Sequence, residues 1–211
     1  MDIYRVKCGN GNCYVLEEKG SAVLVDTGTI EYRKAIEEKI KRFPIKLIVL
    51  THGHFDHCQN ADYFSKLFGA PVAMNKKDVG LLKNQMKEKL SAKTIPGKIV
   101  LLFSLLSFKK VKMNITPSVF LEDGDLLKAY GVDAEVIALP GHTQGSIGID
   151  CKEDCVIVGD ALMNMFYPTV SMLYGNEKMM RQSAEKIKKM GDKTIYFGHG
   201  KPVKTYLINL K

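Results

Sequence analysis

The chain has 211 residues, of which 45% are hydrophobic and 26% are charged, and its formal net charge is +8. This composition excludes a disordered, collagen-like or coiled-coil chain, and the length suits one or two domains. The five cysteines are scattered, and the charged N-terminus lacks the apolar core of a signal peptide, so we expect a cytoplasmic protein with reduced thiols. The apolar stretch at residues 99–108 is about half the length that spans a bilayer, which predicts no transmembrane segment.

The first half of the chain predicts a hairpin, a helix and a strand in that order. Residues 14–26 hold two apolar runs around a polar turn and end at Asp26. Residues 30–43 have apolar side chains at helical spacing, and residues 45–50 form a short buried strand. The string THGHFDH follows this strand at residues 51–57.

The middle segment, residues 76–112, has a different composition. It contains ten lysines and only two acids, Asp78 and Glu88, so it carries the whole net charge of the chain. We expect a basic helical insertion, broken at Pro96-Gly97, within a single domain over residues 1–211. A lid or pocket wall that holds an anionic part of a small-molecule substrate is the favoured role. Contact with RNA and contact with a membrane or a second subunit are the alternatives.

The second half repeats the order of the first. Residues 146–159 form another hairpin that ends at Asp160, residues 177–190 form an amphipathic helix, and the strand at 194–197 runs into a Gly-His-Gly string. The segment KLIVLTHG thus corresponds to KTIYFGHG, and Asp26 corresponds to Asp160. This duplication predicts an α/β (α+β) fold with two similar sheets, helices outside, and the ends of matching strands along one edge.

All five histidines lie at predicted strand ends on that edge, together with two aspartates. Imidazole and carboxylate ligands without a thiolate suit zinc and, less selectively, iron or manganese. Seven candidate ligands exceed the three or four that one catalytic zinc takes, so two metal ions are expected. The candidate ligands are His52, His54, Asp56, His57, His142, Asp160 and His199.

The motifs VDTG, THGHFDH, PGHTQGS, GDAL and GHG, in this order over about residues 12–200, resemble those of the metallo-β-lactamase fold superfamily. The resemblance implies a four-layer αββα sandwich and a dinuclear centre. It assigns three histidines to one metal and Asp56, His57 and His199 to the other, with Asp160 bridging and Asp26 supporting the metal loop from behind. The three histidines are His52, His54 and His142.

Two zinc ions and a shared water predict hydrolysis by a metal-bound hydroxide, which Asp56 ligates and orients. Asp160 stands where the best-known β-lactamases of this superfamily have cysteine, and His54 where flavodiiron proteins have glutamate. The chain is therefore most similar to compact, glyoxalase-II-like metallo-hydrolases, with a thioester, ester or lactone as substrate. Only eleven residues follow Gly200, so we expect no helical extension of the kind that glyoxalase II has.

Two alternatives to this function stay open, and two tyrosines complete the predicted site. The alternatives are a phosphodiesterase or nuclease acting on RNA and a mononuclear-iron persulfide dioxygenase. Tyr167 and Tyr174 follow Asp160 closely enough to bind substrate, where a phenol could stabilise the developing oxyanion.

Overall fold

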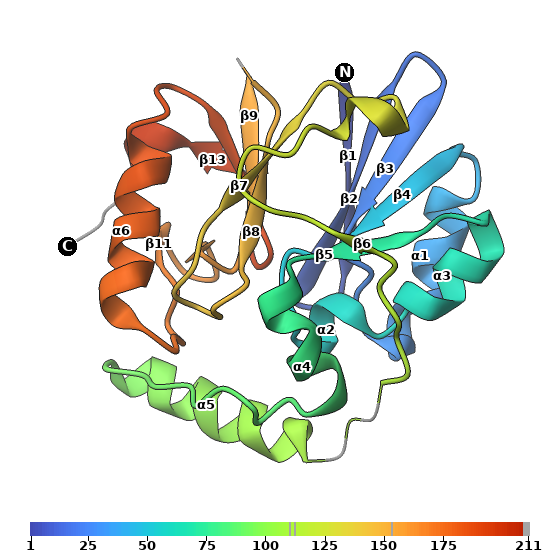
Figure 1. Ribbon diagram of the computed structural model, residues 1–211. Coiled ribbons are helices and arrows are strands. Elements are labelled where there is room, and N and C mark those ends of the chain that lie inside the picture. The colour runs from blue at the N-terminus through green and yellow to red at the C-terminus, as the bar shows by residue number, and fades with distance from the viewer. Residues whose placement is uncertain (110, 112, 153, 209–211) are drawn as a thin grey trace.

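The computed structural model describes residues 1–109, 111, 113–152 and 154–208. Two β-sheets pack face to face and helices cover both outer faces, as Figure 1 shows with the first half on the right and the second half on the left. This arrangement confirms the predicted four-layer αββα sandwich of two similar halves.

The first sheet has six strands in the order β1-β2-β3-β4-β5-β6. Strands β1 to β3 are antiparallel neighbours, whereas β3 to β6 run parallel. Their bounds are β1 (Asp2–Cys8), β2 (Gly11–Glu18), β3 (Ser21–Val25), β4 (Ile45–Val49), β5 (Val72–Met74) and β6 (Val119–Phe120).

The second sheet repeats the same motif, an antiparallel pair followed by a parallel strand. Its order is β13-β12-β9-β8-β7, in which β9 and β12 are parallel, as β3 and β4 are in the first sheet. The bounds are β7 (Glu135–Ala138), β8 (Ile147–Asp150), β9 (Cys155–Gly159), β12 (Thr194–Phe197) and β13 (Val203–Lys204). A separate hairpin joins β10 (Leu162–Met163) to β11 (Thr169–Val170).

Three amphipathic helices cover the outer faces of the sandwich (Figure 1). Helices α1 (Arg33–Ile40) and α3 (Ala61–Phe68) bury Ile36, Ile40 and Phe64 against the first sheet. Helix α6 (Glu177–Lys188) buries Ala184 and Ile187 against the second sheet. Another cluster of buried apolar side chains fills the space between the two sheets. It includes Leu16, Val25, Val49, Ile149 and Ile157.

The basic segment forms the short helices η2 (Lys76–Asp78) and α4 (Val79–Lys83) and the longer α5 (Ile95–Phe108), which lies across one end of the sandwich in Figure 1. The predicted break at Pro96-Gly97 is wrong, because α5 begins there. Proline is accepted in the first turn, where its missing N–H has no partner to lose, and the Thr94 side chain accepts a hydrogen bond from the Gly97 N–H. Lys110 and Lys112 lie outside the described residues.

The remaining short helices are η1 (Ile30–Tyr32), α2 (Phe55–Cys58), η3 (Leu127–Tyr130) and η4 (Thr205–Leu207). In the described part of the chain, no helix has the length and apolar character needed to cross a bilayer.

Candidate metal centre

The seven predicted ligands gather at one edge of the sandwich because the strands that precede them end there. The loop that begins after β4 carries four of them, and the other three come from the second sheet, where they follow β7, β9 and β12. Within three overlapping groups of these side chains, the potential ligand atoms lie within 4.8 Å of one another. In chain order the seven are His52, His54, Asp56, His57, His142, Asp160 and His199.

Three buried histidines form one group. The Nδ1 atom of His54 lies 2.9 Å from the Nε2 atom of His142, and the His52 ring is stacked edge-on against both rings. Burial lowers the pKa of His52 and lowers that of His54 to about 3, so both rings are neutral and have a free lone pair. Three imidazole rings around one point suit a transition-metal ion.

Asp56, His57 and His199 form a second group beside it. The Nε2 atom of His199 lies 3.3 Å from a carboxylate oxygen of Asp56 and 3.3 Å from one of Asp160. The carboxylate of Asp160 also lies 3.5 Å from His57 and 3.8 Å from His142, so it stands between the two groups.

In the metal-free protein, protonated histidine rings balance the negative charge of the aspartates in and around the second group. Burial alone would lower the pKa of His57, but Asp26, Asp160 and Asp56 raise it to about 9. Burial would likewise raise the pKa of Asp160, yet His199 and His57 hold it well below its usual range. A divalent cation can take the place of these imidazolium protons.

Several buried atoms of the cluster have no hydrogen-bond partner among the described residues, including Nε2 of His52, Nε2 of His57 and Oδ1 of Asp160. These three side chains together make one of the three groups. An unsatisfied polar atom in a protein interior is costly, and coordination to a metal ion removes that cost. The residues present therefore fit a metal centre.

The outward nitrogens of three histidine rings are hydrogen-bonded, which leaves Nε2 to face the cluster. His57 Nδ1 lies 2.8 Å from Asp26 Oδ2, His142 Nδ1 donates to the Leu173 carbonyl, and His199 Nδ1 donates to the Asn10 carbonyl. Such partners orient ligand rings in metal sites.

Asp26 also supports the loop that carries the first four ligands. Its carboxylate accepts the N–H of Thr51, the residue before His52. The φ of Asp26 is +60°, a value that is rare for a non-glycine residue and that persists where the surrounding contacts enforce it.

Asp78 is a buried residue of the site that the sequence interpretation missed. Its carboxylate accepts the N–H groups of Gly53 and Gly145 and the hydroxyl of Thr143. Gly53 lies between two candidate ligands, and Thr143 directly follows a third, so Asp78 connects two loops that carry the cluster. The only signal for this role was an acid within a lysine-rich segment.

Gln85 supports the first of these loops as well. Its side chain donates to the Gly53 carbonyl and accepts the Phe55 N–H. The first part of the segment predicted to be an insertion is therefore built into the wall behind the candidate ligands.

A cavity of about 400 Å³ opens onto the cluster, and α5 forms much of its wall. Among the described residues that line it, there is no lysine or arginine. Its apolar lining consists of Phe55, Leu90, Val100, Phe103, Phe108, Met163, Met165 and Leu173.

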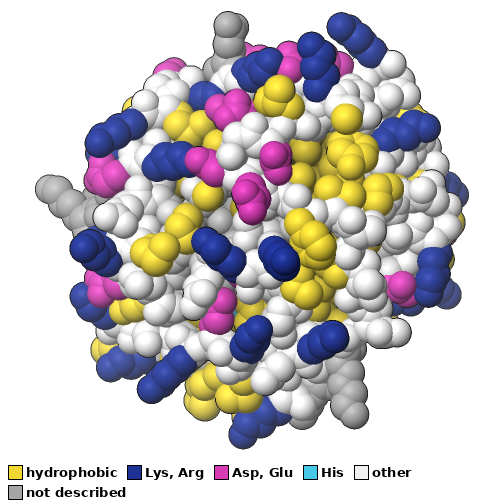
Figure 2. All heavy atoms as spheres, in the orientation of Figure 1, with side chains coloured by type: hydrophobic (Ala, Val, Ile, Leu, Met, Phe, Trp, Pro, Cys, Tyr) yellow, Lys and Arg dark blue, Asp and Glu magenta, His cyan; other side chains and the backbone are white. Residues whose placement is uncertain are grey.

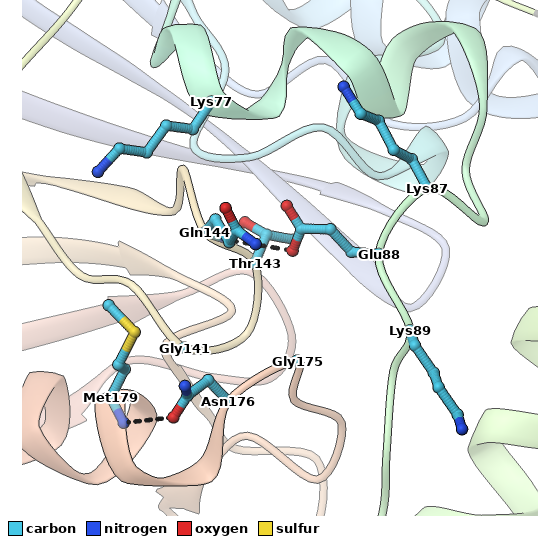
Figure 3. Close-up of a pocket in the computed structure, with 10 residues that line it drawn as sticks. All are labelled: Lys77, Lys87, Glu88, Lys89, Gly141, Thr143, Gln144, Gly175, Asn176 and Met179. Atoms are coloured by element: carbon cyan, nitrogen blue, oxygen red, sulfur yellow. Dashed lines mark hydrogen bonds between the residues drawn. The ribbon is translucent and has the colours of Figure 1, made fainter.

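The lysines predicted to bind an anionic group lie elsewhere. Lys77, Lys87 and Lys89 line another cavity, of about 420 Å³, beside the loop of His142. Figure 3 shows their side chains extending in three different directions, with Glu88 between them, bonded to the Gln144 N–H. They do not converge on one anion-binding point.

Tyr167 and Tyr174 do not line the cavity at the cluster either. Both line a third cavity, of about 550 Å³, which shares no lining residue with the cavity at the cluster. Tyr167 is exposed to solvent. Because no described contact brings these phenols to the candidate ligands, the geometry gives no support to their predicted role at the oxyanion.

Comparisons with known proteins show which family the chain resembles. Residues 6–199 match the family model described as the metallo-beta-lactamase superfamily. The chain is 31% identical over 200 residues to a probable metallo-hydrolase of Methanocaldococcus jannaschii, covering 90% of this chain and 88% of the relative. It is 26% identical over 165 residues to the hydroxyacylglutathione hydrolase GloC of Haemophilus influenzae, and the match covers 77% of this chain and 71% of GloC.

Two solved structures share the fold. The BLEG-1 B3 metallo-beta-lactamase superimposes with a TM-score of 0.77 at 22% identity, covering 98% of this chain and 95% of that one. TTHA1623 in a di-iron-bound form superimposes with a TM-score of 0.71 at 20% identity, and the match covers 98% of this chain and 96% of that one.

Proposed function

Because the chain belongs to the metallo-beta-lactamase superfamily and is a metallo-hydrolase, we propose that it hydrolyses a thioester, ester or lactone at a dinuclear centre. Three histidines would hold one metal ion. Asp56, His57 and His199 would hold the other, and Asp160 would bridge the two. The three histidines of the first site are His52, His54 and His142, whose ring nitrogens already face one another.

Zinc is the metal we propose, since the cluster offers imidazole and carboxylate but no thiolate. Iron and manganese accept the same donors, and one neighbour of the same fold is titled as di-iron-bound. When bound, two such ions act as Lewis acids and lower the pKa of a water toward neutrality. Asp56 is partly exposed and lines the cavity, so its carboxylate would both hold a metal ion and orient this water.

The single observation that narrows the class of substrate is the apolar lining of the cavity at the cluster. Eight apolar side chains line the space in front of the cluster. Apart from the candidate ligands, the polar lining residues are Asn10, Ser104 and Ser107, and all three are uncharged. An apolar surface of this kind favours an uncharged acyl group of several carbons beside the reacting carbonyl. We therefore propose an apolar acyl group, in place of the anionic portion expected from the lysines.

The reaction class rests on the relatives and on the cluster together. GloC is named as a hydrolase of hydroxyacylglutathione, and this chain covers 71% of its length. From that name we take hydrolysis of an acyl bond as the reaction class. No described contact favours RNA, because the lining of the cavity offers no cationic side chain to hold a phosphate backbone.

A substrate panel tests the proposal. The protein is purified, its metal content is measured, and the zinc, iron and manganese forms are each given acetyl and octanoyl thioesters, an acyl-homoserine lactone, an RNA oligonucleotide and glutathione persulfide. We expect about two metal ions per chain and preferred hydrolysis of the thioesters and lactone. Activity confined to RNA, or oxygen consumption with the persulfide on one iron, would contradict the proposal.

His54→Ala is the matched test of the metal assignment. We expect it to lose at least one metal ion and the hydrolytic activity. Asp62→Asn, a change of an exposed carboxylate on α3, serves as the control and should retain both.

A further inference from the structure

Helix α5 is apolar on both of its faces, which is unusual for a helix at a protein surface. Its inner face packs Val100, Leu101, Leu105 and Phe108 against the apolar cluster beside the cavity. A helix that is hydrophobic all round is normally buried on all sides. Here the other face is open to solvent.

The open face forms a continuous stripe. Ile95, Ile99, Leu102 and Leu106 follow one another at intervals of three or four residues, the spacing of one helix face, and are 51–76% exposed. Exposed apolar surface of this kind marks a binding surface on a soluble protein. We call these four residues the outer stripe.

The loop at residues 165–167 extends the apolar surface beyond α5. Phe166 and Tyr167 are 73% and 61% exposed, and both line one cavity together with Pro96 at the start of α5. Met165 and Phe103 of α5 both line the cavity at the cluster, which we call the metal-facing cavity. Aromatic side chains of this type suit a boundary between water and an apolar phase.

The charge around the outer stripe is positive. Lys98 lies within α5 and Lys109 follows its last residue, and both are exposed. Of the two acids in residues 76–112, Asp78 is buried and Glu88 bonds the Gln144 N–H. Figure 2 shows apolar side chains surrounded by lysines and arginines at the lower end of the molecule, where α5 lies in Figure 1.

We propose that the outer stripe and the 165–167 loop dock on the surface of a membrane that contains anionic phospholipid. The 14 residues of α5 span about 21 Å, which is too short to cross a bilayer, so the helix would lie in the plane of the interface. The apolar stripe would enter the acyl boundary, and the lysines would meet the lipid phosphates.

A second copy of the chain fits this surface less well. Docking α5 on α5 would bring the exposed Lys98 and Lys109 of the two copies near each other, and repulsion between these cations would oppose association. RNA would meet the lysines but would leave the apolar stripe exposed to water. An anionic membrane satisfies both the charge and the apolar surface.

Vesicle sedimentation with the full chain tests this proposal. We expect the protein to bind vesicles with about 30% anionic phosphatidylglycerol at least about fivefold better than pure phosphatidylcholine vesicles, and to bind less as salt is raised. Replacing Ile99, Leu102 and Leu106 together with Gln should abolish binding. The matched control is Leu67→Gln, which changes an apolar residue of α3 that is 45% exposed.

A fluorescence reporter keeps the test independent of the triple variant. The chain has no tryptophan, so Leu102→Trp introduces a single one on the outer stripe. Its emission should shift to the blue on addition of anionic vesicles and be quenched by brominated lipid, whereas that of Leu67→Trp should not change. Circular dichroism and metal content verify that each variant is folded.

Three results would overturn the proposal. The first is a wild-type protein that binds neither kind of vesicle. The second is a triple variant that binds as well as wild type. The third is a dimer, or a complex with polyuridylate, that forms while the emission of the Leu102→Trp variant is unaffected by vesicles.

Discussion

The carboxylate of Asp78 accepts a hydrogen bond of 2.9 Å from the backbone N–H of Gly53, the residue between His52 and His54. The same carboxylate accepts the N–H of Gly145, three residues after His142. One buried side chain thus holds together two loops that carry the candidate ligands of the first metal.

This connection predicts the effect of Asp78→Asn. The amide keeps the size of the side chain but turns one acceptor into a donor that faces backbone N–H groups. We expect a loss of about 1–3 kcal/mol in stability and fewer metal ions per chain, measured by thermal unfolding and metal analysis. Asp62→Asn is the exposed control. A variant with wild-type stability and metal content would show that the connection is dispensable.

Stability of the metal-free protein should depend on pH through His57. Its pKa in the fold is about 9, above the ordinary value of 6.5. The protonated ring therefore stabilises the fold fully below pH 6.5, and this contribution, on the order of 3 kcal/mol, is lost as pH rises through 9. The raised pKa of His199 acts in the same direction.

Urea unfolding of chelator-treated protein between about pH 6 and 9.5 measures this effect. The zinc form should vary less over this range, because the metal would take the place of the protons. Stability of the metal-free protein that stays constant or rises with pH would contradict the prediction.

Gly198→Ala should damage the site by steric overlap. A Cβ atom at this position would collide with Oδ1 of Asp160 and lie 2.7 Å from Cε1 of His57. We expect a large loss of metal and activity with the overall fold retained, measured by metal analysis and circular dichroism. Gly175→Ala is the matched control, since its Cβ would lie 3.5 Å from its nearest neighbour, an ordinary contact. Full metal content in Gly198→Ala would speak against the assigned ligands.

Ser104→Phe should change the preference for acyl length. Ser104 lines the metal-facing cavity, so a phenyl ring there would occupy the space proposed for the acyl group. We expect kcat/KM for an octanoyl thioester to fall about tenfold or more, with a smaller effect on the acetyl thioester. Leu106→Phe, on the outer face of α5, should leave both values near wild type. An equal loss for both substrates would point to damage other than filling of the cavity.

Tyr167→Phe and Tyr174→Phe test the remaining sequence-based interpretation. Both phenols line a cavity apart from the candidate ligands, so removing the hydroxyl should change kcat by less than about twofold. A fall of about a hundredfold in kcat would restore their role at the oxyanion.

Much of the fold and of the cluster could be predicted because the signals are local in the sequence. THGHFDH places four candidate ligands after one strand, and apolar periodicity identified the helices α1 and α6 and the strands β2, β3, β4, β8, β9 and β12. The role of Asp78 could not be predicted in this way, since its partners are backbone groups of Gly53 and Gly145, which belong to distant loops.

The lysine-rich segment forms a pocket wall as predicted, but the expectation that its lysines hold an anionic group at the cluster gains no support, for a related reason. Charge is visible in a sequence, but the direction of a flexible side chain depends on the packing around its backbone. Lys77, Lys87 and Lys89 extend in different directions (Figure 3), and the metal-facing wall comes from Val100, Phe103 and other apolar residues of the same segment.

The division of the cluster between the two sheets has a consequence for folding. The group of His52, His54 and His142 takes residues from both halves of the chain, and so does the group of Asp56, His57 and His199. Neither half alone can offer a complete coordination shell. Metal binding should therefore be among the last steps of folding. A tightly bound ion would then stabilise the folded protein against separation of its two halves.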